Sequence, residues 1–423
     1  MNIRTKHGMA LAAALVAVAS AQAEMMDRPE GIKIGQRLTL KPYVAFSATY
    51  DSNVAGNKDR ADDVIWTVNP GFTLDYKAES WYLKGTGNYS YNGYLRGGHA
   101  NEYSYHNYGE SILFGWNSAP KSEKGWSLML NQSFILMNSI NDITLSDGSS
   151  YGRDTRDFRF GGSLEHRFTE RLHADISASY YWLDYDNSNQ ASSLYGWSRW
   201  QVGGEIGYAA SKWFDILVSA NYANYRQDNT SNIYYDRSGY GRDLSNDSES
   251  WSLMAGFGSF ATDRISYRLL VGWNHFEYAG RYHSTDAMTY SASGRWLIGE
   301  TWNMMLLATC QYQPSEREYG SSQRTDSLSW GIAKSLVRGK VNATFDICYR
   351  HEGHDYSMLN TQNYNLDTLT FRLGLNYTFN RYLALFGRAE YRRSFDDGKG
   401  KASADYDYDY DRFRASLGFR LTY

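Results

Sequence analysis

The sequence predicts an all-β fold, a single antiparallel transmembrane β-barrel of about 18 strands with short periplasmic turns and long extracellular loops. Three observations support this prediction. Apolar and polar residues alternate with a period of two along most of the chain. The connections between these segments are alternately short and long. Aromatic residues, 16% of the chain, gather at the ends beside the short connections. Such an aromatic content also argues against disorder.

The first residues have the features of an export signal. Arg4 and Lys6 precede an apolar run from Met9 to Ala19, and Ala21-Gln22-Ala23 is a small-residue cleavage site. The run is too short to span a bilayer as a helix. We therefore expect a signal peptide over 1–23, a periplasmic tail over 24–37 and a barrel over 38–423. Cleavage near Ala23 would send the mature chain to the cell outer membrane.

The alternation defines each strand and its two faces. In the last segment, Phe413, Ala415 and Leu417 alternate with Arg412 and Arg414, which is the strand period. The expected strands begin near Leu40, Val64, Trp81, Tyr103, Trp126, Thr155, Leu172, Trp197, Trp213, Ser250, Arg264, Ala287, Trp302, Asp326, Val341, Thr368, Tyr382 and Arg412.

Short turns on one side and long loops on the other are typical of outer-membrane barrels. In lipid the backbone groups must all be paired, so the strands have to close on themselves. Eighteen tilted strands enclose a backbone diameter of roughly 35 Å, too wide for side chains to fill. We expect water or a folded-in loop in the lumen.

Two features resemble known outer-membrane proteins. The final strand ends on Phe419, Leu421 and Tyr423, which resembles the C-terminal assembly signal of such barrels. Tyr50-Asp51-Ser52-Asn53-Val54, followed by Asp62-Asp63-Val64, Asn69-Pro70-Gly71-Phe72 and Asp75-Tyr76, resembles the β-barrel porin type 2 family. The resemblance implies a porin-like role, and some members of that family are encoded beside exopolysaccharide synthesis genes.

No residue pattern singles out catalytic chemistry, a cofactor or a metal. His351 and His354 form an H-x-x-H pair in an expected loop, where a solvated loop is favoured over a metal site. Asp405, Asp407, Asp409 and Asp411 could hold Ca²⁺ but lack the EF-hand pattern, so a hydrated loop is favoured. Cys310 and Cys348 are expected to be unpaired thiols.

The polar faces carry an uneven distribution of charge. Between Asp75 and Asp215 we expect seven carboxylates in the lumen, those of Asp75, Glu110, Asp157, Glu165, Asp175, Glu205 and Asp215. From residue 264 onward, only Asp346 and Glu390 stand against nine arginines, and Lys41 adjoins them at the closure. The predicted basic wall comprises Lys41, Arg268, Arg295, Arg350, Arg372, Arg388, Arg392, Arg412, Arg414 and Arg420.

Three functions remain open. The favoured function is a porin-like channel for small hydrophilic solutes. The basic wall would favour anionic solutes, because cationic walls attract anions. An exopolysaccharide conduit or scaffold is the first alternative, and an outer-membrane enzyme or adhesin the second. The expected partners are outer-membrane lipid, lipopolysaccharide, the barrel-assembly machinery, and solutes or polysaccharide. Lys+Arg 43 against Asp+Glu 46 gives no reason to expect nucleic acid.

Overall fold

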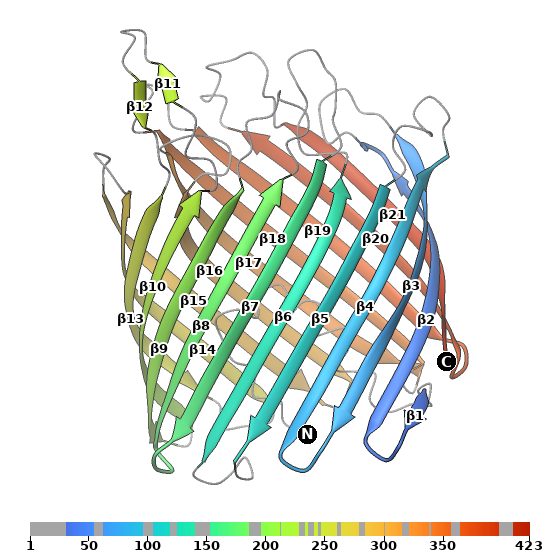
Figure 1. Ribbon diagram of the computed structural model, residues 1–423, viewed down its shortest axis with the longest axis horizontal. Coiled ribbons are helices and arrows are strands. Elements are labelled where there is room, and N and C mark those ends of the chain that lie inside the picture. Colours follow the sequence, from blue (N-terminus) through green and yellow to red (C-terminus); the bar gives the residue numbers. More distant parts are fainter. Residues whose placement is uncertain are drawn as a thin grey trace.

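The protein is a closed antiparallel β-barrel (Figure 1). The computed structural model describes residues 31–54, 62–95, 105–118, 125–139, 153–185, 196–211, 213–227, 233–235, 241–243, 247–259, 264–278, 284–299, 301–314, 321–337, 340–356, 364–396 and 409–423. The eighteen long strands found there are β2 (Leu38–Asp51), β3 (Asp63–Lys77), β4 (Trp81–Tyr94), β5 (Tyr105–Asn117), β6 (Trp126–Ser139), β7 (Arg153–Arg167), β8 (Leu172–Tyr185), β9 (Trp197–Ser211), β10 (Phe214–Gln227), β13 (Ser248–Ser259), β14 (Ile265–Tyr278), β15 (Thr285–Ile298), β16 (Trp302–Pro314), β17 (Ser321–Leu336), β18 (Val341–Tyr356), β19 (Tyr364–Thr378), β20 (Leu383–Asp396) and β21 (Tyr410–Thr422).

The barrel closes between its first and last long strands. β21 pairs with β2 from Tyr43↔Thr422 to Asp51↔Arg414. The short strand β1 (Ile32–Ile34), within the expected tail, pairs with the lower end of β2. Strands β11 (Ile233–Tyr235) and β12 (Gly241–Asp243) form a separate two-stranded hairpin beyond the rim. The predicted fold class is confirmed, and the expected strand starts lie within a few residues of the observed ones.

The short connections are tight turns fixed by local hydrogen bonds. Between β7 and β8, Thr169 Oγ1 accepts bonds from the backbone N–H groups of Arg171 and Leu172 at 3.1 and 2.9 Å. Between β19 and β20, Asn380 Oδ1 accepts equivalent bonds from Tyr382 and Leu383. Gly299, after β15, has a φ of 61°, a backbone conformation that glycine adopts without steric cost.

The outer face is apolar and the inner face is polar. On β21, Phe413, Leu417 and Phe419 are exposed to the outside, and Arg412 and Arg414 point into the lumen. Large aromatics are exposed beside the short turns, among them Trp126, Phe168, Trp213, Trp296, Phe379 and Tyr382, which is the girdle expected at a membrane interface. No helix among the described residues is long and apolar enough to cross a membrane.

Candidate functional site

The lumen face is the candidate site, and it holds every residue of the predicted basic wall. The ladder registers place these ten side chains on the polar face of β2, β14, β15 and β18 to β21. Residues Phe419, Leu421 and Tyr423 lie on the opposite face of β21, exposed to the outside. The two predicted groups therefore occupy opposite sides of the same wall.

Four cations of the basic wall form ion pairs away from the β2–β21 closure. Lys41 Nζ lies 3.8 Å from Asp75 Oδ2. Arg268 binds Glu205, which reaches it from β9 across two intervening strands. Arg350 Nε contacts Glu352 Oε1 at 2.6 Å. Arg372 lies between two carboxylates, with its Nε 2.8 Å from Glu390 Oε2 and its Nη1 3.4 Å from Asp346 Oδ2.

A buried ionic cluster joins β2 to β21 at the upper end of the closure. The Asp51 carboxylate is 0% exposed and accepts hydrogen bonds from two guanidinium groups. Arg412 Nη2 lies 2.6 Å from Asp51 Oδ2, and Arg414 Nε lies 2.7 Å from the same oxygen. These charge-assisted bonds span 361 and 363 positions of sequence, so they form only when the barrel closes.

The residues after Asp51 complete this closure cluster. Asn53 N donates to Asp51 Oδ1 at 3.1 Å, and its side-chain amide donates to Asp411 O at 3.2 Å. Ser52 N donates to Phe413 O, and Ser52 Oγ accepts from Phe413 N. The Asp51-Ser52-Asn53 stretch, part of the resemblance to the β-barrel porin type 2 family, therefore joins the first long strand to the last one by hydrogen bonds and ion pairs.

Four cations of the basic wall have no carboxylate within salt-bridge distance in the described part of the chain. Arg295 Nε donates to Asn303 Oδ1 at 3.3 Å. The guanidinium groups of Arg388, Arg392 and Arg420 instead lie over aromatic rings, those of Phe386, Tyr410 and Tyr43, at 5.7, 5.8 and 3.6 Å. Uncompensated positive charge is therefore concentrated on β20 and β21.

The structure corrects the expected charge balance in two ways. Two carboxylates that the prediction did not count, those of Asp51 and Glu352, lie in strands on the lumen face and form ion pairs with Arg412, Arg414 and Arg350 of the basic wall. Glu110 was assigned to the lumen, and this was wrong. It pairs with Gly87 and Phe134 on the outer face, where its carboxylate accepts a bond from Tyr108 Oη at 2.7 Å. The excess of lumen cations is smaller than predicted.

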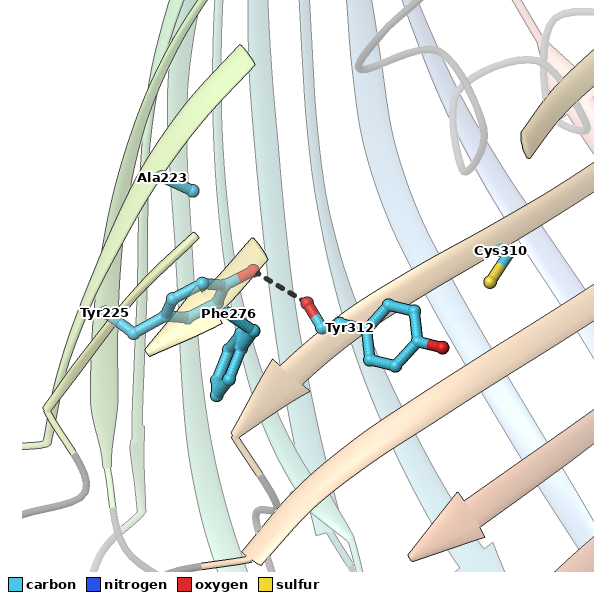
Figure 2. Close-up of a cluster of buried hydrophobic side chains, with 5 residues drawn as sticks. All are labelled: Ala223, Tyr225, Phe276, Cys310 and Tyr312. Carbon is cyan, nitrogen blue, oxygen red and sulfur yellow. Dashed lines mark hydrogen bonds between the residues drawn. The ribbon is translucent and has the colours of Figure 1, made fainter. Parts of the chain in front are cut away.

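The upper lumen is narrowed where β16 leaves its neighbour. Among the described residues, the β15–β16 ladder ends at Ser291↔Thr309, although both strands continue upward. Above that point a side chain replaces the backbone ladder bonds, because Thr289 Oγ1 donates to Cys310 O at 2.9 Å. Further up, Tyr225 Oη of β10 donates to Tyr312 O at 3.4 Å (Figure 2). β10 is four strands away around the barrel, so the upper end of β16 must lean into the lumen.

This inward lean buries a small aromatic core inside the barrel. Ala223, Tyr225, Phe276, Cys310 and Tyr312 pack together, with the Phe276 ring 0% exposed (Figure 2). Ring contacts extend the core along the lumen face, with centroid separations of 6.3 Å for Tyr225–Phe276 and 6.0 Å for Trp197–Tyr225. The lumen is therefore constricted on the side opposite the closure seam.

Replacing Tyr225 by alanine is expected to widen this constriction. The change removes the hydroxyl that donates to Tyr312 O and the ring that packs beneath β16, so single-channel conductance in planar bilayers should rise above that of the unmodified protein. Tyr180→Ala, which removes an exposed tyrosine from the outer face of β8, is the matched control and should leave conductance unchanged. Equal conductance of Tyr225→Ala and the unmodified protein would contradict a constriction at this point.

The other predicted candidates gain no function from the structure. His351 lies in β18 rather than in a loop, and its Nδ1 is 2.9 Å from Asp367 Oδ1. The His354 side chain, Asp405 and Asp407 lie outside the described residues. Arg393 contacts Asp409 and Asp411 at 2.9 and 2.8 Å. No group of metal-ligating side chains occurs among the described residues, and Cys310 and Cys348 are free thiols.

The fold and its charged lumen define the class of membrane-spanning β-barrels. No family model matches the chain, and no curated protein matches its sequence. Among solved structures, it is similar to the ferric enterobactin receptor of Pseudomonas aeruginosa, with 8% identity and a TM-score of 0.48 over 93% of this chain and 81% of that one. It is also similar to the siderophore receptor PirA of Acinetobacter baumannii, with 10% identity and a TM-score of 0.47 over 93% and 81%. A third similar structure is the FrpB iron transporter of Neisseria meningitidis, with 10% identity and a TM-score of 0.48 over 95% of this chain and 83% of that one. At these values the likeness says nothing of what this chain binds.

Proposed function

We propose that this protein is an outer-membrane, porin-like channel that passes small hydrophilic anions. The observation that supports this proposal is the position of Arg388, Arg392 and Arg420. All three lie on the lumen face of two adjacent strands, and no carboxylate among the described residues pairs with them. Cationic linings favour anions in membrane pores.

These three charges are distributed along the height of the wall. Arg420 lies opposite Ala384, and Arg388 and Arg392 follow four and eight residues further up β20, so at about 3.3 Å per residue neighbouring charges are about 13 Å apart. This spacing exceeds the Debye length of about 8 Å at physiological salt and is well within the roughly 30 Å at 0.01 M salt. Arg392 is paired across the ladder with Arg412, whose own charge is offset by Asp51. The three arginines therefore form a positive strip whose fields overlap at low salt, where the local anion concentration should rise along it.

Neutralising this strip is expected to remove anion preference. The triple variant Arg388→Gln, Arg392→Gln, Arg420→Gln keeps polar side chains on the lumen face and deletes three charges. Under a salt gradient, the reversal potential of the unmodified channel should show Cl⁻ preferred over K⁺, more strongly at low salt, and the variant should shift toward K⁺.

The matched control is Lys41→Gln with Asp75→Asn, which removes an existing ion pair without changing the net charge. Its reversal potential should equal that of the unmodified channel. A cation-selective unmodified channel, or a triple variant with unchanged selectivity, would refute the proposal.

A second candidate function is passage of polysaccharide. Two aromatic rings lie side by side on the lumen face of β8 and β9, with the Tyr181 and Trp197 centroids 4.7 Å apart. Arg159 lies over the Tyr181 ring at 4.9 Å. Flat apolar faces with polar neighbours suit sugar rings. An acidic oligosaccharide that interrupts the current reversibly, less so in Trp197→Ala, would favour this role.

A further inference from the structure

A charged residue lies at mid-height on the lipid-facing side of the barrel. The outward pairs of the β5–β6 ladder run from Tyr108↔Leu136 at the top to Trp116↔Leu128 at the bottom, with Ile112↔Gln132 at the centre and Glu110↔Phe134 directly above it. Tyr108 and Ile112, which share the face of Glu110, are exposed to the outside. An ionisable group at bilayer depth is costly and points to a function.

Glu110 belongs to a small polar group on this face. Tyr108 Oη donates to Glu110 Oε2 at 2.7 Å, and Gln132 Nε2 donates to Glu110 Oε1 at 3.4 Å. The amide of Gln132 carries two N–H donors and a carboxylate accepts several bonds. Each residue therefore keeps hydrogen-bonding capacity that aliphatic lipid chains cannot satisfy.

The tilt of the strands brings Glu110 and Gln132 to one depth. Figure 1 shows β4 to β7 slanting upward to the right with β4 on the right, so the step from β5 to β6 rises. For a tilt of about 40°, Phe134 on β6 lies about 3 Å higher along the membrane normal than Glu110 on β5. Gln132, two residues further down β6, lies about 5 Å lower than Phe134. Glu110 and Gln132 thus lie side by side, and Phe134 and Ile112 lie one above the other midway between them.

We propose that this face binds a second copy of the chain about a two-fold axis along the membrane normal. Such an axis preserves depth and exchanges left with right. Glu110 then faces Gln132 of the partner subunit, and Gln132 faces Glu110 of the partner subunit, so an acceptor meets a donor twice. Phe134 and Ile112 lie on the axis, where each meets its own counterpart. The polar group is self-complementary only in this arrangement.

Cysteine cross-linking in outer membranes tests the axis. Ile112→Cys in the full chain should give a disulfide-linked dimer under mild oxidation, because the two thiols meet on the axis. Leu253→Cys, at mid-height on the outer face of β13, is the matched control and should stay monomeric. The native thiols of Cys310 and Cys348 are buried or lumen-facing, and the unmodified chain reports their background. Absence of cross-linking at position 112 would overturn the two-fold arrangement.

Removing the polar group tests what holds the copies together. Glu110→Leu with Gln132→Leu should halve the protein mass per particle in lipid nanodiscs, whereas Glu110→Gln, which keeps a hydrogen-bonding side chain, should preserve the dimer. Heat-modifiable mobility of each variant shows that the barrel is folded. An unmodified protein with monomeric mass, or a trimer without cross-linking at position 112, would overturn the proposal. Ion selectivity is measured separately, so failure here leaves the proposed channel function unaffected.

Discussion

Replacing Asp51 by alanine is expected to destabilise the closed barrel more than any other single lumen substitution. The carboxylate is fully buried and accepts bonds from Arg412 and Arg414. Its removal leaves two guanidinium groups facing each other without an anion, and loss of one partner from a buried ion pair costs about 3–5 kcal/mol. Because the pair links the first and last strands, the cost applies directly to closure.

The measurement is the temperature at which the purified barrel loses its compact, heat-modifiable mobility. Asp51→Ala should lose it at a clearly lower temperature and accumulate less in the outer membrane. Asp75→Asn is the matched control, because its partly exposed carboxylate only contacts Lys41 at 3.8 Å, and such pairs contribute about 0–1 kcal/mol. Equal melting of the two variants would show that the closure cluster has no special role.

Deleting Leu421 to Tyr423 is expected to prevent assembly of the barrel. Leu421 pairs with both Val44 and Leu383, Thr422 N donates to Tyr382 O at 2.8 Å, and Tyr423 N donates to Pro42 O at 3.0 Å. The Tyr423 ring also stacks on Tyr382 at 6.5 Å. The deletion frees backbone groups on both neighbouring strands at the membrane boundary, where unpaired groups are costly.

Fractionation of cells that express the deletion should show little protein in the outer membrane and degraded protein in the periplasm. Tyr423→Ser separates the side chain from the backbone, since it keeps the bond to Pro42 O and loses the stack on Tyr382. We expect an intermediate outer-membrane level for it. A normal level of heat-modifiable barrel after the deletion would show that these three residues are dispensable for assembly.

The sequence alone determined the fold and most side-chain orientations. Along β21 a strict period of two separates Arg412 and Arg414 from Phe413 and Leu417, and a lipid-facing surface has to be apolar, so periodicity assigns each face. The same reasoning placed all ten residues of the basic wall in the lumen. Periodicity failed at β5. Ile112, Leu113 and Phe114 are apolar in succession there, so the alternation does not show which face of the strand carries Glu110.

Only the tertiary structure decided which charges neutralise each other and where the barrel departs from regularity. Asp51 meets Arg412 across 361 positions, and Glu205 reaches Arg268 across 63. These distances are bridged by ladder register and barrel closure, which no local pattern encodes. The inward lean of β16 likewise depends on Tyr225 from a strand 87 positions earlier. Periodicity fixes the face of a residue because it is a local property, whereas its partner depends on how the whole sheet closes.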